Sequence, residues 1–154
     1  MADVAEAERI AVLVNSLSEK FILCDFSPQG RERFLSEHGT EMVAARIRKH
    51  FLYCVAECEG ELVGVVSMRD KTHLHHLFVT ETFQRRGLAR RLWETVMTQC
   101  LQAGNPGVFT VNSSRFAVPV YERFGFRAAG AEQNAGGVLF LPMRFSGLQA
   151  RDAH

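Results

Sequence analysis

Three histidines with side chains suited to proton transfer stand close together in one apolar, strand-forming run, at positions 73, 75 and 76. Imidazole has an unperturbed pKa of about 6.5, so it can take up and release a proton near neutral pH. Side-chain alternation along a strand predicts two faces, one with His73, His75 and Leu77 and the other with Leu74, His76 and Phe78. His73 and His75 are therefore candidate proton acceptors. A solvated strand end and a metal site are the alternatives, and because the sequence offers no third ligand nearby we expect no metal.

The polar segment that follows this run, Gln84 to Ala89, has features of a phosphate-binding loop. A strand that leads directly into a helix exposes unpaired backbone N–H groups at the positive end of the helix dipole, and these favour a phosphate group. Gly87 removes a side chain where phosphate oxygens would approach, and Ala89 keeps the next approach small. Arginines at positions 85, 86, 90 and 91 add positive charge. An ordinary turn before a helix is the alternative, and the glycine spacings of dinucleotide folds and P-loops do not occur here.

Composition indicates one globular domain. The 154 residues, 47% apolar and 23% charged, suffice for a single core, which we assign to residues 1–148, with a disordered tail at 149–154. Eighteen basic and seventeen acidic residues nearly balance, which argues against a nucleic-acid or anionic-membrane partner. We expect a cytoplasmic protein, because the sequence has neither an apolar run of roughly 20 residues nor a secretory signal pattern. Its four cysteines form no CxxC pair, which indicates reduced thiols.

The first fifty residues carry helical patterns. Ile10, Leu13 and Leu17 recur at helical spacing, Ser27 and Pro28 are typical of a helix start, and Thr40 is the expected cap of a third helix.

The rest of the chain alternates between strands and helices. The expected strands are residues 51–57, 61–68, 74–80, 108–112, 127–131 and 138–145, and the expected turns include 59–60, 70–71 and 134–137. A long helix begins near Leu88 and a short one covers 117–123, with Gly125 as its stop. Strand, helix and strand in succession imply a parallel pair within an otherwise antiparallel sheet. The expected fold class is α/β (α+β), one mixed sheet covered by helices.

Two motifs in this order resemble those of the GNAT superfamily of N-acetyltransferases. Gln84-Arg85-Arg86-Gly87-Leu88-Ala89 resembles the signature Q/R-x-x-G-x-G/A. Val118-Pro119-Val120-Tyr121-Glu122-Arg123-Phe124-Gly125-Phe126 resembles the block A-x-x-x-Y-x-x-x-G-F, and Val111 to Ser114 resembles the strand between the motifs. The resemblance covers residues 51–145. One departure is visible: the family usually begins with a strand, and too few residues precede the first helix here for a long one.

The resemblance implies a single GNAT-like domain that uses acetyl-CoA, releases coenzyme A and transfers acetyl directly to an amine. The backbone amides that would hold the pyrophosphate are those of Arg85, Arg86, Gly87, Leu88, Ala89 and Arg90. Phe78 and Val79 would pair through their main chain with the pantetheine arm, which requires the parallel strands to splay apart, commonly through a bulge. A backbone N–H near Leu77 would meet the oxyanion. Asn112 and Tyr121 would line the thiol end of the cofactor.

His-Leu-His before the signature and Tyr-Glu-Arg-Phe-Gly-Phe after it are similar to the arylalkylamine N-acetyltransferases that act on serotonin. There the paired histidines serve the amine and the tyrosine serves the thiolate. An alkylamine, with a pKa of roughly 10, arrives protonated at neutral pH. We therefore expect His73 or His75 to take its proton, directly or through water, and Tyr121 to protonate the thiolate. A core tyrosine that closes a short helix is the alternative for Tyr121.

The acceptor is predicted less directly. The N-terminal helices should build part of its pocket, where Phe21, Phe26 and Phe34 either offer apolar surface or belong to the core. A small amine is our first expectation, and a protein N-terminus or lysine is the second. A non-catalytic acyl-CoA-binding module and a homodimer both remain compatible with the sequence.

Overall fold

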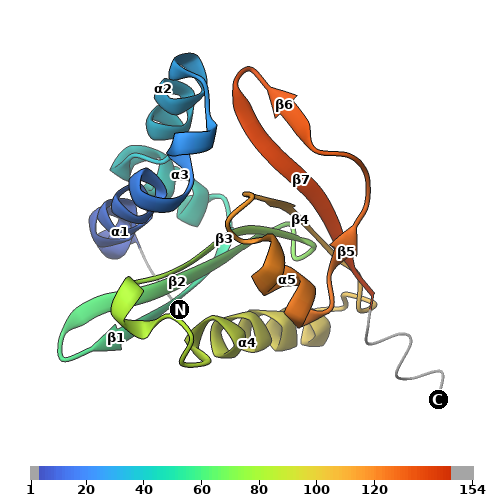
Figure 1. Cartoon of the computed structure of the whole chain (residues 1–154). Coiled ribbons are helices and arrows are strands. Elements are labelled where there is room, and N and C mark those ends of the chain that lie inside the picture. Colours follow the sequence, from blue (N-terminus) through green and yellow to red (C-terminus); the bar gives the residue numbers. More distant parts are fainter. Residues whose placement is uncertain (1–3, 147–154) are drawn as a thin grey trace.

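A computed structural model describes residues 4–146 of the chain. In this part five helices flank one seven-stranded sheet with the order β1-β2-β3-β4-β7-β5, and β6 pairs with β7 (Figure 1). Every strand pair is antiparallel except β3 with β4. The predicted mixed sheet with one parallel pair is confirmed. The tail predicted at 149–154 lies outside the described residues.

Three helices come first: α1 (Ala7–Phe21), α2 (Pro28–Glu37) and α3 (Thr40–Arg48). Ser27 caps α2 as predicted, because its Oγ accepts a hydrogen bond from the Gly30 N–H at 3.1 Å. The expected cap of the third helix was one residue off, since Gly39 is the N-cap and Thr40 is the first helical residue. Within residues 4–146 the first strand is β1, in agreement with the departure from the family pattern noted above.

Three strands then form two tight hairpins: β1 (Leu52–Cys58), β2 (Glu61–Arg69) and β3 (His73–Val79). The backbone is left-handed at Glu59 and Gly60, with φ of 53° and 80°, and again at Asp70 and Lys71. Such turns match the twist of the strands that they join. Both predicted turns are therefore confirmed.

The C-terminal half contains α4 (Leu88–Gln102), β4 (Phe109–Ser113), α5 (Val118–Phe124), β5 (Arg127–Ala128), β6 (Gln133–Ala135) and β7 (Val138–Phe145). The strand predicted at 127–131 is only two residues long. The turn predicted at 134–137 shrinks to two glycines, because residues 133–135 pair with β7 instead. All three residues of β6 are exposed and polar or small, so no apolar pattern indicated this strand.

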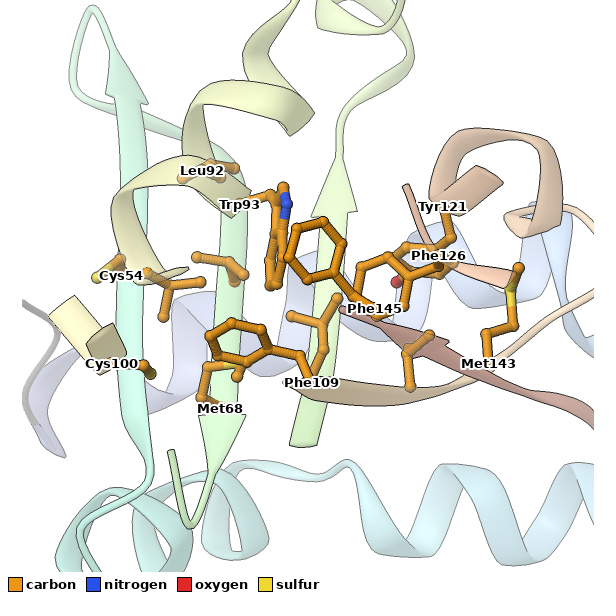
Figure 2. Packing of buried hydrophobic residues seen from close by; sticks show 14 of the residues in the cluster. Cys54, Met68, Leu92, Trp93, Cys100, Phe109, Tyr121, Phe126, Met143 and Phe145 are labelled. Carbon is orange, nitrogen blue, oxygen red and sulfur yellow. The ribbon is translucent and has the colours of Figure 1, made fainter. Parts of the chain in front are cut away.

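Apolar side chains pack against both faces of the sheet. On one face α4 and α5 cover a cluster in which Trp93 contacts Phe109, Phe126 and Phe145, with ring centroids 5.1–5.5 Å apart (Figure 2). On the other face α1 and α3 pack on Tyr53 and Val65. We call these the α4 face and the α1–α3 face.

All four cysteines are free thiols, two exposed and two buried. No helix in residues 4–146 is long and apolar enough to cross a membrane.

Candidate active site

Strands β3 and β4 separate after two residue pairs. Their parallel register joins His73 to Thr110 and Leu74 to Val111 and stops there. Beyond this point β3 continues to Val79 along β2, whereas β4 continues along β7 (Figure 1). The predicted splay is therefore present, and residues 75–79 of β3, which include Leu77 and Phe78, border the gap.

A β-bulge lies at His75, where the register with β2 steps from Leu74–Met68 to His76–Ser67. The bulge reverses the side-chain alternation beyond it. Leu74 is buried in the cluster of the α4 face, whereas the rings of His75 and His76 lie 4.2 Å apart, and both contact aromatic residues of the α1–α3 face. The predicted faces are therefore wrong: His75 and His76 point to the same side, and Leu77 packs with the α4 face.

A third histidine joins this pair from the connection between α2 and α3. The ring of His38 lies 5.9 Å from that of His75 and 4.9 Å from that of His76. Its Nδ1 lies 2.7 Å from the carbonyl oxygen of Phe34. Since a carbonyl only accepts, Nδ1 carries the proton. The expectation that no third ligand lies near the histidines of β3 is therefore wrong, because the fold brings His38 to them.

Burial keeps these imidazoles neutral. Desolvation, followed by the charge of Arg69, lowers the pKa of His73 to about 4. Desolvation, followed by the charge of Arg46, lowers the pKa of His75 to about 3. Burial also lowers the pKa of His38 to about 4 and that of His76 well below its ordinary value. At neutral pH each ring therefore keeps a lone pair. His73 Nδ1 also lies 2.8 Å from the Thr110 hydroxyl across the β3–β4 pair.

The loop after β3 leads into α4, which begins at Leu88 as the sequence predicted. Gly87 is the N-cap of α4, with φ of 82°, and within residues 4–146 no side chain caps this helix. A Cβ at Gly87 would meet no described protein atom within 4 Å. Gln84 ties the loop to the end of β3, because its Nε2 donates to the Val79 carbonyl at 3.0 Å. The first amides of α4 therefore have no side-chain partner among the described residues, and the space at Gly87 is open.

Side chains around this loop divide between core and solvent. Leu88 and Ala89 pack against the cluster of the α4 face. Arg85, Arg86 and Arg90 are exposed. The Arg90 guanidinium lies over the Phe124 ring at 5.1 Å and donates to the Arg123 carbonyl. Three exposed arginines therefore lie in the segment around the start of α4.

Tyr121 lies on the opposite side of the sheet from the histidines. It is 5% exposed, belongs to the cluster of the α4 face and contacts Phe126 at 5.5 Å (Figure 2). Burial raises the pKa of its phenol, so the group stays protonated. Asn112 is exposed on β4, between the buried residues Val111 and Ser113. The proton-donor candidate and the proton-acceptor candidates thus lie on opposite faces of the sheet.

Aromatic side chains continue the histidine group toward α2. Phe34 stacks on His38 at 4.0 Å and contacts Phe26 at 5.8 Å, while Phe21 stacks on Phe116 at 4.5 Å. The three phenylalanines singled out in the sequence are half-buried, so they are not deep core residues. Phe116, 47% exposed, was missed because an isolated loop phenylalanine carries no periodic signal.

A splayed parallel pair, followed by an exposed helix N-terminus and a buried tyrosine, defines an acyltransferase of the GNAT type. The family model described as "Acetyltransferase (GNAT) domain" matches residues 22–146, and this chain belongs to that family of enzymes. No curated protein matches the chain significantly.

Solved structures with the same fold are distant in sequence. The PaiA N-acetyltransferase from Thermoplasma acidophilum, in complex with coenzyme A, is 11% identical with a TM-score of 0.75, over 94% of this chain and 95% of that one. The aminoglycoside 6'-N-acetyltransferase from Enterococcus faecium is 13% identical with a TM-score of 0.65, over 91% and 89%. The ribosomal-protein-alanine N-acetyltransferase from Brucella melitensis is 19% identical with a TM-score of 0.61, over 93% and 95%.

Proposed function

We propose that this enzyme transfers the acetyl group of acetyl-CoA directly to the primary amine of a small molecule and releases coenzyme A. The observation that carries the proposal is the splay between β3 and β4, with neutral histidines on one face and a protonated tyrosine on the other. A thioester in this gap would be within reach of groups on both faces.

The cofactor would bind along the splay and the start of α4. The exposed amides from Arg85 to Arg90 suit the pyrophosphate, and the open space at Gly87 leaves room for it. The main chain of Phe78 and Val79 would pair with the pantetheine arm, and the Leu77 N–H would meet the carbonyl oxygen. The relative from Thermoplasma acidophilum, which holds coenzyme A, supports this assignment.

The reaction then needs the nitrogen to lose two protons and the sulfur to gain one. The protonated amine first gives up a proton, directly or through water, to His73 or His75, and the free nitrogen then attacks the acetyl carbonyl carbon, so that the new C–N bond replaces the C–S bond. Tyr121 donates its proton to the departing thiolate, the nitrogen loses its second proton, Tyr121 regains one from solvent, and one proton is released overall. Because burial lowers both histidine pKa values, neither ring holds the proton for long, and it must pass on to solvent. No acyl-enzyme is needed in this scheme.

A small, partly apolar amine fits the aromatic surroundings best. Phe34 and Phe26 extend from the histidines, and the exposed Phe116 stacks on Phe21. Relatives of the same fold bear the names of both small-molecule and protein acceptors, an aminoglycoside and a ribosomal-protein alanine. A peptide N-terminus is therefore the second candidate acceptor.

Mass spectrometry of products tests the proposal. The enzyme is incubated with acetyl-CoA and a panel of arylalkylamines, polyamines, aminoglycosides, amino acids and short peptides, and mass detection avoids interference from its four free thiols. We expect acetylation of one class of small amines. Acetylation of peptides alone would replace the small-molecule acceptor. Tight binding of acetyl-CoA without any product would favour a non-catalytic acyl-CoA-binding module.

A further inference from the structure

His38, His75 and His76 form a cluster on the α1–α3 face that acetyl transfer does not require as a unit. Each residue offers one ring nitrogen, and these three nitrogens all lie within 4.8 Å of one another. We call this group the histidine triad. It draws on two distant parts of the chain, the α2–α3 connection and the middle of β3.

The bulge builds the triad. In a regular strand, consecutive residues point to opposite faces, so His75 and His76 would be separated by the sheet. The register step at His75 brings both rings to one side, 4.2 Å apart. Bulges commonly serve to re-aim a side chain near a functional site. The neighbouring rings thus result from a specific backbone feature.

Several ring nitrogens of the triad have no protein partner. His76 is 3% exposed, and both of its nitrogens, together with Nε2 of His75, are buried without a hydrogen bond to any of residues 4–146. A buried polar atom without a partner is destabilising, so such atoms usually face water or a ligand. Three nitrogen atoms left unsatisfied in one place indicate a site for a bound species.

His38 is oriented as a metal-ligating histidine would be. Its Nδ1–H donates to the Phe34 carbonyl, which fixes the tautomer and leaves the Nε2 lone pair for a ligand. Histidines that bind metals almost always donate their other ring N–H to a carbonyl, a carboxylate or water. The stack of Phe34 on His38 at 4.0 Å further restrains the ring.

We propose that the histidine triad binds a divalent transition-metal ion, zinc above all, with water as a fourth ligand. Neutral imidazole suits zinc, copper and nickel, whereas magnesium and calcium need oxygen ligands. Zn–N bonds of about 2.0–2.1 Å in a tetrahedron place nitrogens about 3.3 Å apart, so the rings must close inward by rotation. Arg46 acts electrostatically on all three rings, and its positive charge weakens binding and makes it reversible.

Occupancy of the triad would inhibit acetyl transfer. An ion on His75 takes the lone pair of a candidate proton acceptor and puts positive charge beside an amine that must lose a proton. This second step rests on the proposed function, whereas metal binding itself does not.

Calorimetry with Zn²⁺ and visible absorption with Co²⁺ test binding on the full chain. We expect one ion per chain, with tetrahedral absorption for cobalt, and no competition from excess Mg²⁺. His38→Gln, His75→Gln and His76→Gln should each weaken binding by more than the 10–100-fold that loss of an outer partner costs. His50→Gln, at an exposed histidine outside the triad, is the matched control and should bind as the wild type does. Circular dichroism verifies that each variant folds.

Three outcomes would overturn the site: no binding, binding unchanged in every folded triad variant, or binding lost when exposed Cys24 and Cys58 are changed to Ser. The activity arm is separate. Zinc should inhibit acetyl transfer by the wild type, and a chelator should restore it. Binding without inhibition would support the metal site and overturn the inhibitory role. Failure to find any acceptor amine would count against the proposed function, but it would not affect the result on metal binding.

Discussion

At the scale of single residues, the proposed role of Tyr121 as the acid that protonates the thiolate can be tested most directly. Tyr121→Phe keeps the ring in its buried position beside Phe126 and removes only the hydroxyl. Because general acids contribute about 10²–10⁴-fold, we expect kcat to fall by a factor in that range while the affinity for coenzyme A stays the same. Steady-state kinetics and calorimetry measure the two quantities.

Tyr53→Phe is the matched control, since Tyr53 is the other tyrosine of the chain and lies in the cluster of the α1–α3 face. It should leave kcat close to that of the wild type. Equal turnover by wild type and Tyr121→Phe at all pH values would remove Tyr121 as the acid.

A substitution at Gly87 tests the proposal that the pyrophosphate of coenzyme A binds at the loop before α4. A glutamate there adds a side chain and a negative charge in the open space before α4. We expect Gly87→Glu to weaken coenzyme A binding at least about tenfold, or ~1.4 kcal/mol, as measured by calorimetry.

Gly60→Glu is a closely matched control. Its φ of 80° resembles the 82° of Gly87, and a Cβ there also meets nothing within 4 Å among the described residues, but it lies in the β1–β2 hairpin. Both variants carry similar backbone strain and the same added charge. If both bind coenzyme A as the wild type does, the pyrophosphate does not lie at Gly87.

The residues that could be predicted are those whose signal is local. Gly87 and Tyr121 lie in short motifs, and the structure makes Gly87 the N-cap of α4 and buries Tyr121 on α5, whereas the place of Tyr121 at the thiol end of the cofactor stays a prediction. The orientation of His75 and His76 could not be predicted, because a bulge depends on the register with β2, which single-strand alternation ignores. His38 was missed for a related reason: only the packing of α2 and α3 on the sheet brings it to the other two rings.

At the scale of elements, the start of α2 lies in close contact with the β6–β7 hairpin. The Ser27 N–H donates to the Gly137 carbonyl at 3.2 Å. A Cβ at Gly30 would come within 2.2 Å of that same carbonyl oxygen. This close approach requires a residue without a side chain at position 30.

Gly30→Ala should therefore force the helix and the hairpin apart. We expect it to lower the free energy of unfolding by about 1–3 kcal/mol, as overpacking does, measured by urea denaturation. Gly130→Ala is the control, because its Cβ would meet only Pro142 at an ordinary 3.6 Å. Equal free energies of unfolding for the two variants would show that the contact between α2 and the hairpin accommodates the added methyl group without loss of stability.

The same contact includes a strand, β6, that could not be predicted from the sequence. The hairpins at Glu59-Gly60 and Asp70-Lys71 follow from turn residues between apolar strands. β6 consists of exposed residues and exists because β7 pairs with it, so only the three-dimensional partner defines it. The α2–hairpin contact joins residues more than a hundred positions apart and leaves no mark on either segment alone.

At the scale of the whole molecule, the sheet separates two sets of packed residues, and each contains one of the two tyrosines. Burial raises the pKa of Tyr121 above its ordinary value of about 10. Burial also raises the pKa of Tyr53, against a smaller opposing effect of the charge of Arg46. Each phenol therefore reports on the integrity of one face of the sheet.

Tyrosine ionisation should consequently be coupled to unfolding. Unfolded phenols lose their protons near pH 10, while the native protein keeps them, so the native state binds more protons and its stability falls as the pH rises above about 10. We expect phenolate absorbance to stay low through pH 10 and then to rise together with the loss of the far-ultraviolet circular dichroism signal. Tyr121→Phe and Tyr53→Phe each halve the absorbance change and so assign it to one face. A gradual titration with a midpoint near 10, in protein that remains folded, would mean that the phenol concerned is open to solvent and that its face of the sheet is not packed as described.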